Sequence, residues 1–165
     1  MIFNICGQPH SGKSTLATYL KKAIETSSPH RKVFIVDGDV LRKILSNDDF
    51  SANGRRTNIY QAYAIAKYLD TTEDFDVIIA VVSPFKELRD ELRLTSNTIE
   101  IYVHTTNIRG REKYHVPYFE PPFLDYIDID TTDVDELTSV NELLNKIQET
   151  IKTWDNNERN KTHRK

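Results

Sequence analysis

The sequence predicts an α/β fold built on a mostly parallel five-stranded sheet. Short apolar runs alternate with stretches in which apolar residues recur at helical spacing, the pattern of strand–helix–strand units with right-handed crossovers. The clearest runs lie at 33–36 and 75–82, and continuous runs of this kind are typical of strands buried on both faces of a parallel sheet. A chain of 165 residues without internal repeats indicates one domain.

The expected elements follow one another regularly. Strands are predicted at Ile2–Cys6, Val33–Val36, Phe75–Val82, Thr98–Val103 and Tyr126–Asp130, the last a candidate for an edge strand. Helices are predicted from the apolar positions within 16–24, 41–45, 59–69 and 134–154, and from the charged segment 85–93. Residues 1–154 form the predicted domain, with a lid at about 105–122 and a disordered polar tail at 155–165.

Composition narrows the class of protein. A net charge of −3 argues against a general nucleic-acid binder, which is normally basic. No apolar run approaches the roughly 18 residues needed to span a membrane. No signal peptide precedes the first strand, so a cytoplasmic location is the expectation. The single cysteine, Cys6, excludes an internal disulfide and is expected to be a small buried apolar residue.

The first predicted loop fits the phosphate-binding template, Gly followed by four free positions and Gly-Lys-Ser. It reads Gly7-Gln8-Pro9-His10-Ser11-Gly12-Lys13-Ser14, between a strand and a helix. Glycines let backbone N–H groups turn toward phosphate oxygens, while Lys13 supplies a charge and the Ser14 hydroxyl can bind Mg²⁺. The strand before it and the helix after it favour a nucleoside triphosphate site over the alternative, a glycine turn capped by Ser11.

Two acidic residues follow the second predicted strand. Asp37 and Asp39 would lie near the phosphate loop if the first two strands were neighbours, because ligands of parallel sheets bind beyond the carboxyl ends of the strands. A carboxylate there could hold Mg²⁺ through water or accept a proton from an attacking hydroxyl. The alternative is that Asp37-Gly38-Asp39 is a turn that caps the next helix.

Basic and aromatic residues mark a second half of the predicted site. Arg42 falls one turn into the short helix, and Phe50, Arg55, Arg56 and Asn58 open the next one. Arginines with an amide and an aromatic ring suit an anionic acceptor that carries a ring. A solvated helix face is the alternative.

Two classes of phosphate-loop protein are not supported. The guanine-specifying Asn-Lys-x-Asp is absent, since Asn145-Lys146 is followed by Gln148 where Asp is required. No Asp ends the 75–82 strand to hold a metal as in an ATPase. A small kinase that moves a phosphoryl group from ATP to a hydroxyl or a phosphate remains.

Several motifs then resemble the adenylylsulfate (APS) kinase family, in its order and near its spacing, from about Ile2 to Ile151. They are Gly7–Thr15, Asp37–Arg42, Phe50-Ser51 with Arg55, Asn58 and Ile59, Ser83-Pro84-Phe85 with Arg89, Pro117–Pro122 and Ile129–Thr131.

The resemblance implies a three-layer P-loop NTPase/kinase fold and transfer of the γ-phosphate of MgATP to the 3′-hydroxyl of APS, giving PAPS in sulfate assimilation. The implied catalytic residues are Lys13, Asp37 and Asp39, with Asp39 as the base or as the group that orients the hydroxyl. The implied metal ligands are Ser14 and, through water, Asp37. The implied ATP contacts are Gly7, Gln8, Pro9, His10, Ser11, Gly12, Lys13, Ser14 and Thr15. The implied acceptor contacts are Asp39, Arg42, Phe50, Arg55, Asn58, Ile59, Ser83, Pro84 and Phe85. The family is often dimeric, so a homodimer stands as an open alternative to a monomer.

The sequence departs from the family pattern on the acceptor side. Between Arg111–Lys113 and Pro117 there is no room for the family's basic stretch and Phe-Thr-Gly, whose Phe faces the adenine of APS opposite Phe50. Tyr60-Gln61 stands where the family tends to have Arg-Arg. The aromatic residues that could replace the missing ring are Tyr114, Tyr118 and Phe119. The acceptor therefore stays open between APS and another nucleotide, nucleoside or sugar, with an ATP-binding protein without turnover as a third alternative.

Overall fold

The computed structural model describes residues 1–72, 75–107, 109–110 and 112–162, and it confirms the predicted α/β fold. The strands that it describes form one parallel sheet of five strands in the order β2-β3-β1-β4-β5. Their bounds are β1 Ile2–Cys6, β2 Val33–Asp37, β3 Asp76–Ala80, β4 Thr98–His104 and β5 Tyr126–Asp130. The last strand lies at an edge, as predicted.

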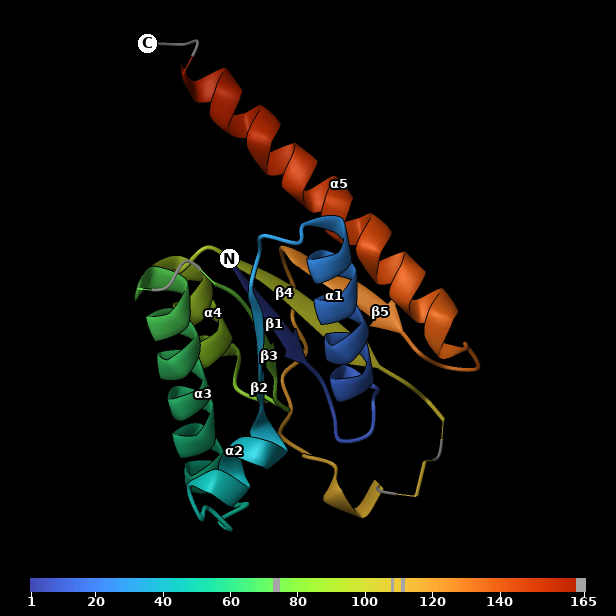
Figure 1. The fold of residues 1–165 in the computed structure, drawn as a ribbon. Helices are drawn as coiled ribbons and strands as arrows, with labels where there is room; N and C mark the ends of the chain where they lie inside the picture. The colour runs from blue at the N-terminus through green and yellow to red at the C-terminus, as the bar shows by residue number, and fades with distance from the viewer. Residues whose placement is uncertain (73–74, 108, 111, 163–165) are drawn as a thin grey trace.

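Helices cover both faces of the sheet (Figure 1). One apolar cluster joins α1 (Lys13–Ser27) and α5 (Glu136–Thr162) to the sheet, with Leu16, Leu20 and Leu143 among its buried members. The other joins α3 (Ala52–Thr72) and α4 (Lys86–Thr95) to the opposite face. The short α2 (Gly38–Ile44) follows β2 directly. In Figure 1 the loop before α1, α2 and the segment with the 3-10 turn η1 (Glu112–Tyr114) gather at the same end of the sheet.

The strand order does not meet the condition under which the sequence placed Asp37 near the phosphate loop. Asp37 was expected near the phosphate loop on condition that β1 and β2 were neighbours, yet β3 lies between them. β3 is also shorter than its apolar run, ending at Ala80 instead of Val82. The backbone of Ser83 adopts a positive φ of 43°, which turns the chain away just beyond the ladder.

The C-terminal helix extends further than predicted. Residues 155–162 continue α5, where the sequence suggested a disordered tail from 155, and 163–165 lie outside the described residues. Polar residues lower the apolar signal without breaking a helix, since each added residue continues the backbone ladder and none here is Pro or Gly. In Figure 1 this end of α5 projects beyond the sheet. None of the helices in the described ranges has both the length and the apolar character that crossing a bilayer requires.

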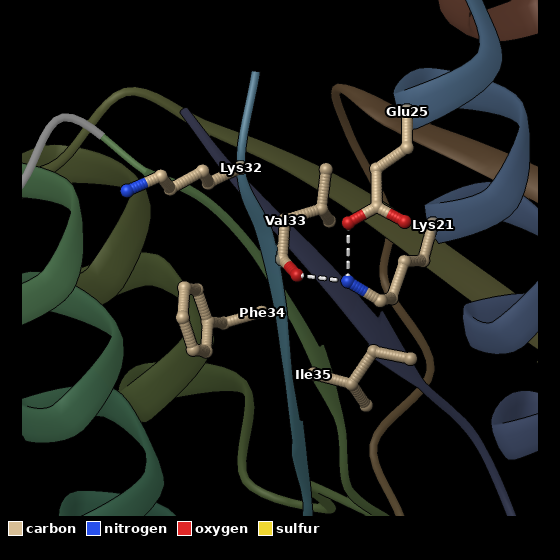
Figure 2. Close-up of a pocket in the computed structure, with 6 residues that line it drawn as sticks. All are labelled: Lys21, Glu25, Lys32, Val33, Phe34 and Ile35. Atoms are coloured by element: carbon tan, nitrogen blue, oxygen red, sulfur yellow. Dashed lines mark hydrogen bonds and ion pairs between the residues drawn. The ribbon is translucent and has the colours of Figure 1, made fainter. Parts of the chain in front are cut away.

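The free edge of β2 is partly covered by α1. Lys21 donates hydrogen bonds from its ammonium to the Val33 carbonyl and to Glu25, across a shallow hollow that Phe34 and Ile35 also line (Figure 2). A lysine on an edge carbonyl blocks pairing with a further strand. The hollow lies beside the beginning of β2, whereas the candidate site residues follow its end.

Candidate active site

The phosphate loop lies between β1 and α1 with the backbone that its glycines were expected to allow. Gly7 has a φ of 143°, and a Cβ built on it would lie 2.0 Å from the Val103 carbonyl oxygen. Gly12 has a φ of 104° as the residue that precedes α1. His10, at a position that the template leaves free, also adopts a positive φ of 64°. Such conformations turn successive N–H groups inward and make an anion-binding concavity.

Lys13 is the buried cation of this loop. Only 8% of it is exposed, and its Nζ donates to the Gln8 carbonyl oxygen at 2.6 Å. Burial lowers the pKa of Lys13 from 10.5 to about 8, while the nearby carboxylates of Asp39 and Asp37 act in the opposite direction. An anion that replaced the Gln8 carbonyl would favour the charged ammonium and raise this pKa.

Nucleotide binding is therefore expected to take up a proton above pH 8. The pKa of Lys13 is about 8 without ligand. The ATP dissociation constant should therefore increase as the pH is raised beyond 8, by at most about tenfold per pH unit. Calorimetry between pH 7 and 9.5, in buffers of different ionisation enthalpy, measures both the affinity and the proton uptake. Equal proton uptake in Lys13→Met would contradict the assignment.

Ser14 and Asp37 meet despite the strand between them. The Ser14 hydroxyl donates to Oδ2 of Asp37 at 2.7 Å. Oδ1 of Asp37 accepts from the backbone N–H groups of Asp39 (2.9 Å) and Val40 (3.1 Å). The capping role and the role beside the phosphate loop are thus compatible, because each uses a different oxygen of Asp37. A hydroxyl and a carboxylate are the hard oxygen ligands that Mg²⁺ prefers.

Arg42, which was predicted to contact the acceptor, is buried and hydrogen-bonded to backbone carbonyl groups. Its guanidinium donates to the carbonyl oxygens of Asn47 (3.1 Å) and Asp49 (2.7 Å), and its Cζ lies 4.5 Å from the centroid of the Phe50 ring. Arg55 lies on the same ring at 5.7 Å and donates from Nε to the Phe50 carbonyl at 3.1 Å. These contacts order the loop that leads into α3.

Asn58 joins α3 to α2, the two helices that carry the predicted acceptor contacts. Its Nδ2 donates to the Gly38 carbonyl oxygen at 3.4 Å, which packs α3 against the start of α2. Its Oδ1 is buried with no hydrogen-bond partner among the described residues. Ile59 beside it is part of the core below.

The Ser83-Pro84-Phe85 segment is held by a buried ion pair. Arg89 on α4, 1% exposed, pairs with Glu100 on β4 (Nε to Oε1, 2.6 Å) and donates to the Ser83 carbonyl oxygen at 2.6 Å. The Phe85 ring stacks on Tyr118 with centroids 5.7 Å apart, and the Cζ of Arg56 lies 4.0 Å from it. Ser83 and Phe85 thus stand beside α3, where the sequence placed the acceptor.

One contact of the lid segment with the phosphate loop uses Arg109, which no sequence pattern singled out. Arg109 donates to the carbonyl oxygens of His10 (3.0 Å) and Thr131 (2.8 Å). The Thr131 hydroxyl donates to the Ser11 carbonyl oxygen at 3.0 Å. Thr131 carried a signal, as part of the late Asp-Thr motif, whereas Arg109 lies in an aperiodic stretch. Residues 108 and 111 of the predicted lid lie outside the described residues.

Cys6, the residue before the phosphate loop, is a buried thiol of low reactivity. Cys6 is fully buried, and burial raises the pKa of its thiol to about 12. This confirms the small buried role that the sequence suggested.

Comparisons with known proteins agree with this geometry. A family model described as adenylylsulphate kinase matches residues 1–114. The adenylyl-sulfate kinase of Burkholderia ambifaria is 34% identical over 103 residues, 60% of this chain and 55% of that protein. The adenylyl-sulfate kinase of Geotalea uraniireducens is 38% identical over 101 residues, 59% of this chain and 47% of its own. The chain thus spans about half the length of the curated relatives that it matches.

A solved structure has the same fold. The APS kinase of Mycobacterium tuberculosis in complex with AMPPNP and APS superposes with a TM-score of 0.73 at 18% identity, over 89% of this chain and 96% of that one. The sheet order, the glycine loop and the flanking helices therefore define a phosphate-loop kinase fold. The family match over residues 1–114 goes further: the chain belongs to the adenylylsulfate kinase family.

Proposed function

We propose that the protein transfers the γ-phosphoryl group of ATP to the 3′-hydroxyl of APS. The observation that carries the proposal is the buried Lys13 beside the Ser14–Asp37 pair, with the acceptor residues of α2 and α3 next to it. The acceptor oxygen would bond to the γ-phosphorus while the bond from that phosphorus to the β–γ bridging oxygen breaks. The products would be ADP and PAPS.

Asp39 would receive or orient the proton of the acceptor hydroxyl. It lies in the first turn of α2, exposed, and its charge acts on Lys13 at the phosphate loop. Phosphoryl transfer depends mostly on positioning and charge neutralisation, so it does not require a strong base. Arg42, Arg55 and Asn58 would orient the acceptor, and Lys13 with the loop backbone would hold the phosphates.

Mg²⁺ would be held by Ser14 and, through water, by Asp37, and it would neutralise the β- and γ-phosphate charge. In the described ranges no three His, Cys, Asp or Glu side chains gather as a metal site. A site of one hydroxyl and one carboxylate fits Mg²⁺, which keeps several waters and binds mainly through substrate phosphates.

A coupled ADP-release assay over a panel of acceptors tests the proposal. We expect ADP when APS is added, and a loss of at least about 10²-fold in kcat for Asp39→Asn. Asp155 is an exposed residue of α5. Asp155→Asn makes the same chemical change away from the site and should keep full activity. ADP release with another acceptor and none with APS would overturn the APS assignment, and ATP binding without turnover on any acceptor would overturn the kinase.

One observation favours a second candidate, a kinase for another nucleotide, nucleoside or sugar. The Phe50 ring already carries the guanidinium groups of Arg42 and Arg55. Tyr118 stacks on Phe85, and Phe119 stacks on Tyr102 with centroids 5.8 Å apart. Phe50, Tyr118 and Phe119 thus each have a partner in this conformation, which suits an acceptor that does not stack between two aromatic rings.

A further inference from the structure

The side chain of Gln8 binds the backbone of the lid. Its Nε2 donates to the Val116 carbonyl oxygen, and its Oε1 accepts from the Val116 N–H, both at 2.9 Å. The amide thus pairs with Val116 as a neighbouring strand would, across 108 positions of sequence. The phosphate-loop template leaves position 8 free, so these bonds are a property of this chain and not of the motif.

The same residue holds the loop lysine through its backbone. Lys13 donates its ammonium to the Gln8 carbonyl oxygen at 2.6 Å. A bound triphosphate would draw this ammonium toward its own oxygens, since an anion is the stronger partner of a buried cation. The Gln8 carbonyl would then lose its hydrogen bond from Lys13, while the Gln8 side chain would keep both hydrogen bonds to Val116.

The segment that begins at Val116 continues onto the acceptor side. Val116 is buried, and two residues later Tyr118 stacks on Phe85. Glu120 then donates from its backbone N–H to the Pro84 carbonyl oxygen at 2.9 Å, and its Oε2 accepts from the Lys86 N–H at 2.6 Å. Residues 116–120, here called the lid root, therefore join the phosphate loop to the wall formed by Pro84 and Phe85.

We propose that Gln8 is a positioning residue that couples occupancy of the phosphate loop to the placement of the lid root on the acceptor side. The coupling runs from Lys13 through Gln8 to Val116 and then to the Tyr118–Phe85 stack. The acceptor half of this inference rests on the proposed kinase function, while the coupling between loop and lid root does not.

Hydrogen exchange without any acceptor tests the coupling itself. In the wild type we expect the ATP analogue AMPPNP to slow amide exchange in the lid root. Gln8→Met keeps the length of the side chain and the loop backbone through which residue 8 would contact phosphate, and it removes both side-chain bonds to Val116. It should abolish this slowing, and because the loop backbone is unchanged, the AMPPNP dissociation constant should change by less than about threefold. Gln8→Glu keeps the oxygen that accepts from Val116 and removes the donor, so its effect should be intermediate.

Two outcomes would overturn the proposal. One is equal slowing of the lid root by AMPPNP in Gln8→Met. The other is a rise in the AMPPNP dissociation constant of Gln8→Met far beyond threefold, so that lost binding alone accounts for the lost slowing. Gln8 would then only shape the phosphate loop. Gln148→Met on exposed α5 is the matched control and should leave both quantities unchanged.

Kinetics provide the second readout. We expect Gln8→Met to raise the KM for APS about tenfold, the effect of one or two net hydrogen bonds, with kcat changed less than about threefold. A loss confined to kcat would contradict a positioning role. Absence of turnover in the wild type would refute the proposed function alone, because the exchange experiment needs no reaction.

Discussion

Lys13→Met is expected to abolish phosphoryl transfer while leaving the protein as stable as before or more stable. The ammonium is the one buried cation that the structure places in the phosphate loop, and loss of such a group costs about 10³-fold in kcat/KM in comparable sites. Folding, in contrast, pays a desolvation cost for this charge. Since burial lowers the pKa of Lys13 to about 8, its removal should raise the free energy of unfolding at pH 7 by about 1–3 kcal/mol.

The change of unfolding free energy with pH provides a second test of the same variant. Between pH 8 and 10.5 the unfolded wild type binds the Lys13 proton that the folded state has released, so this group makes stability rise with pH across that window. Lys13→Met should lose the rise. Urea unfolding at pH 7 and pH 9.5 measures both effects, with Lys22→Met, exposed on the same helix, as the control. Destabilisation of Lys13→Met by several kcal/mol would contradict the desolvation account.

Much of the fold could be predicted because its signals are local. β1 and β5 coincide with their predicted runs, since apolar stretches bounded by turn residues leave few alternatives. The glycine loop was also predictable, because Gly7 and Gly12 must both adopt positive φ angles. The length of α5 was not, since its last turns have no apolar face to mark them.

The contacts between distant segments could not be predicted from local patterns. The Ser14–Asp37 hydrogen bond joins residues that follow β1 and β2, although β3 lies between these two strands. Neither residue type indicates this contact in the sequence. The pairing of Gln8 with Val116 uses a free template position and a backbone group. Arg42 was identified as a ligand for an anion, yet its bonds to Asn47 and Asp49 show that it also orders its own loop. A sequence names the chemistry of a side chain, whereas packing decides which partner it reaches.

The Arg89–Glu100 ion pair is another contact that local sequence patterns did not predict. Because both side chains are buried, breaking this pair should destabilise the protein more than breaking an exposed ion pair. Glu100 is 2% exposed, and without Arg89 its carboxylate would retain the weak Cys6 thiol donor (Sγ to Oε1, 3.8 Å) and the more distant Arg93 (Nε to Oε2, 3.4 Å). Arg89→Met should therefore lower the free energy of unfolding by about 3–5 kcal/mol at pH 7. Arg56→Met removes an exposed ion pair with Glu87 together with the contact of its guanidinium with the Phe85 ring, and should cost no more than about 2 kcal/mol.

A double-mutant cycle separates the lost interaction from the buried charge that is left behind. Adding Glu100→Leu to Arg89→Met removes that charge, so the double variant should recover part of the stability lost in Arg89→Met. It should not recover the acceptor side, because Arg89 also donates to the carbonyl oxygens of Ser83 and Glu120. Ser83 has a positive φ, and without these bonds the strained turn has less to hold it. Restored stability with a raised KM for the acceptor would show that the ion pair positions this wall of the site, whereas restored stability and KM together would limit its role to folding.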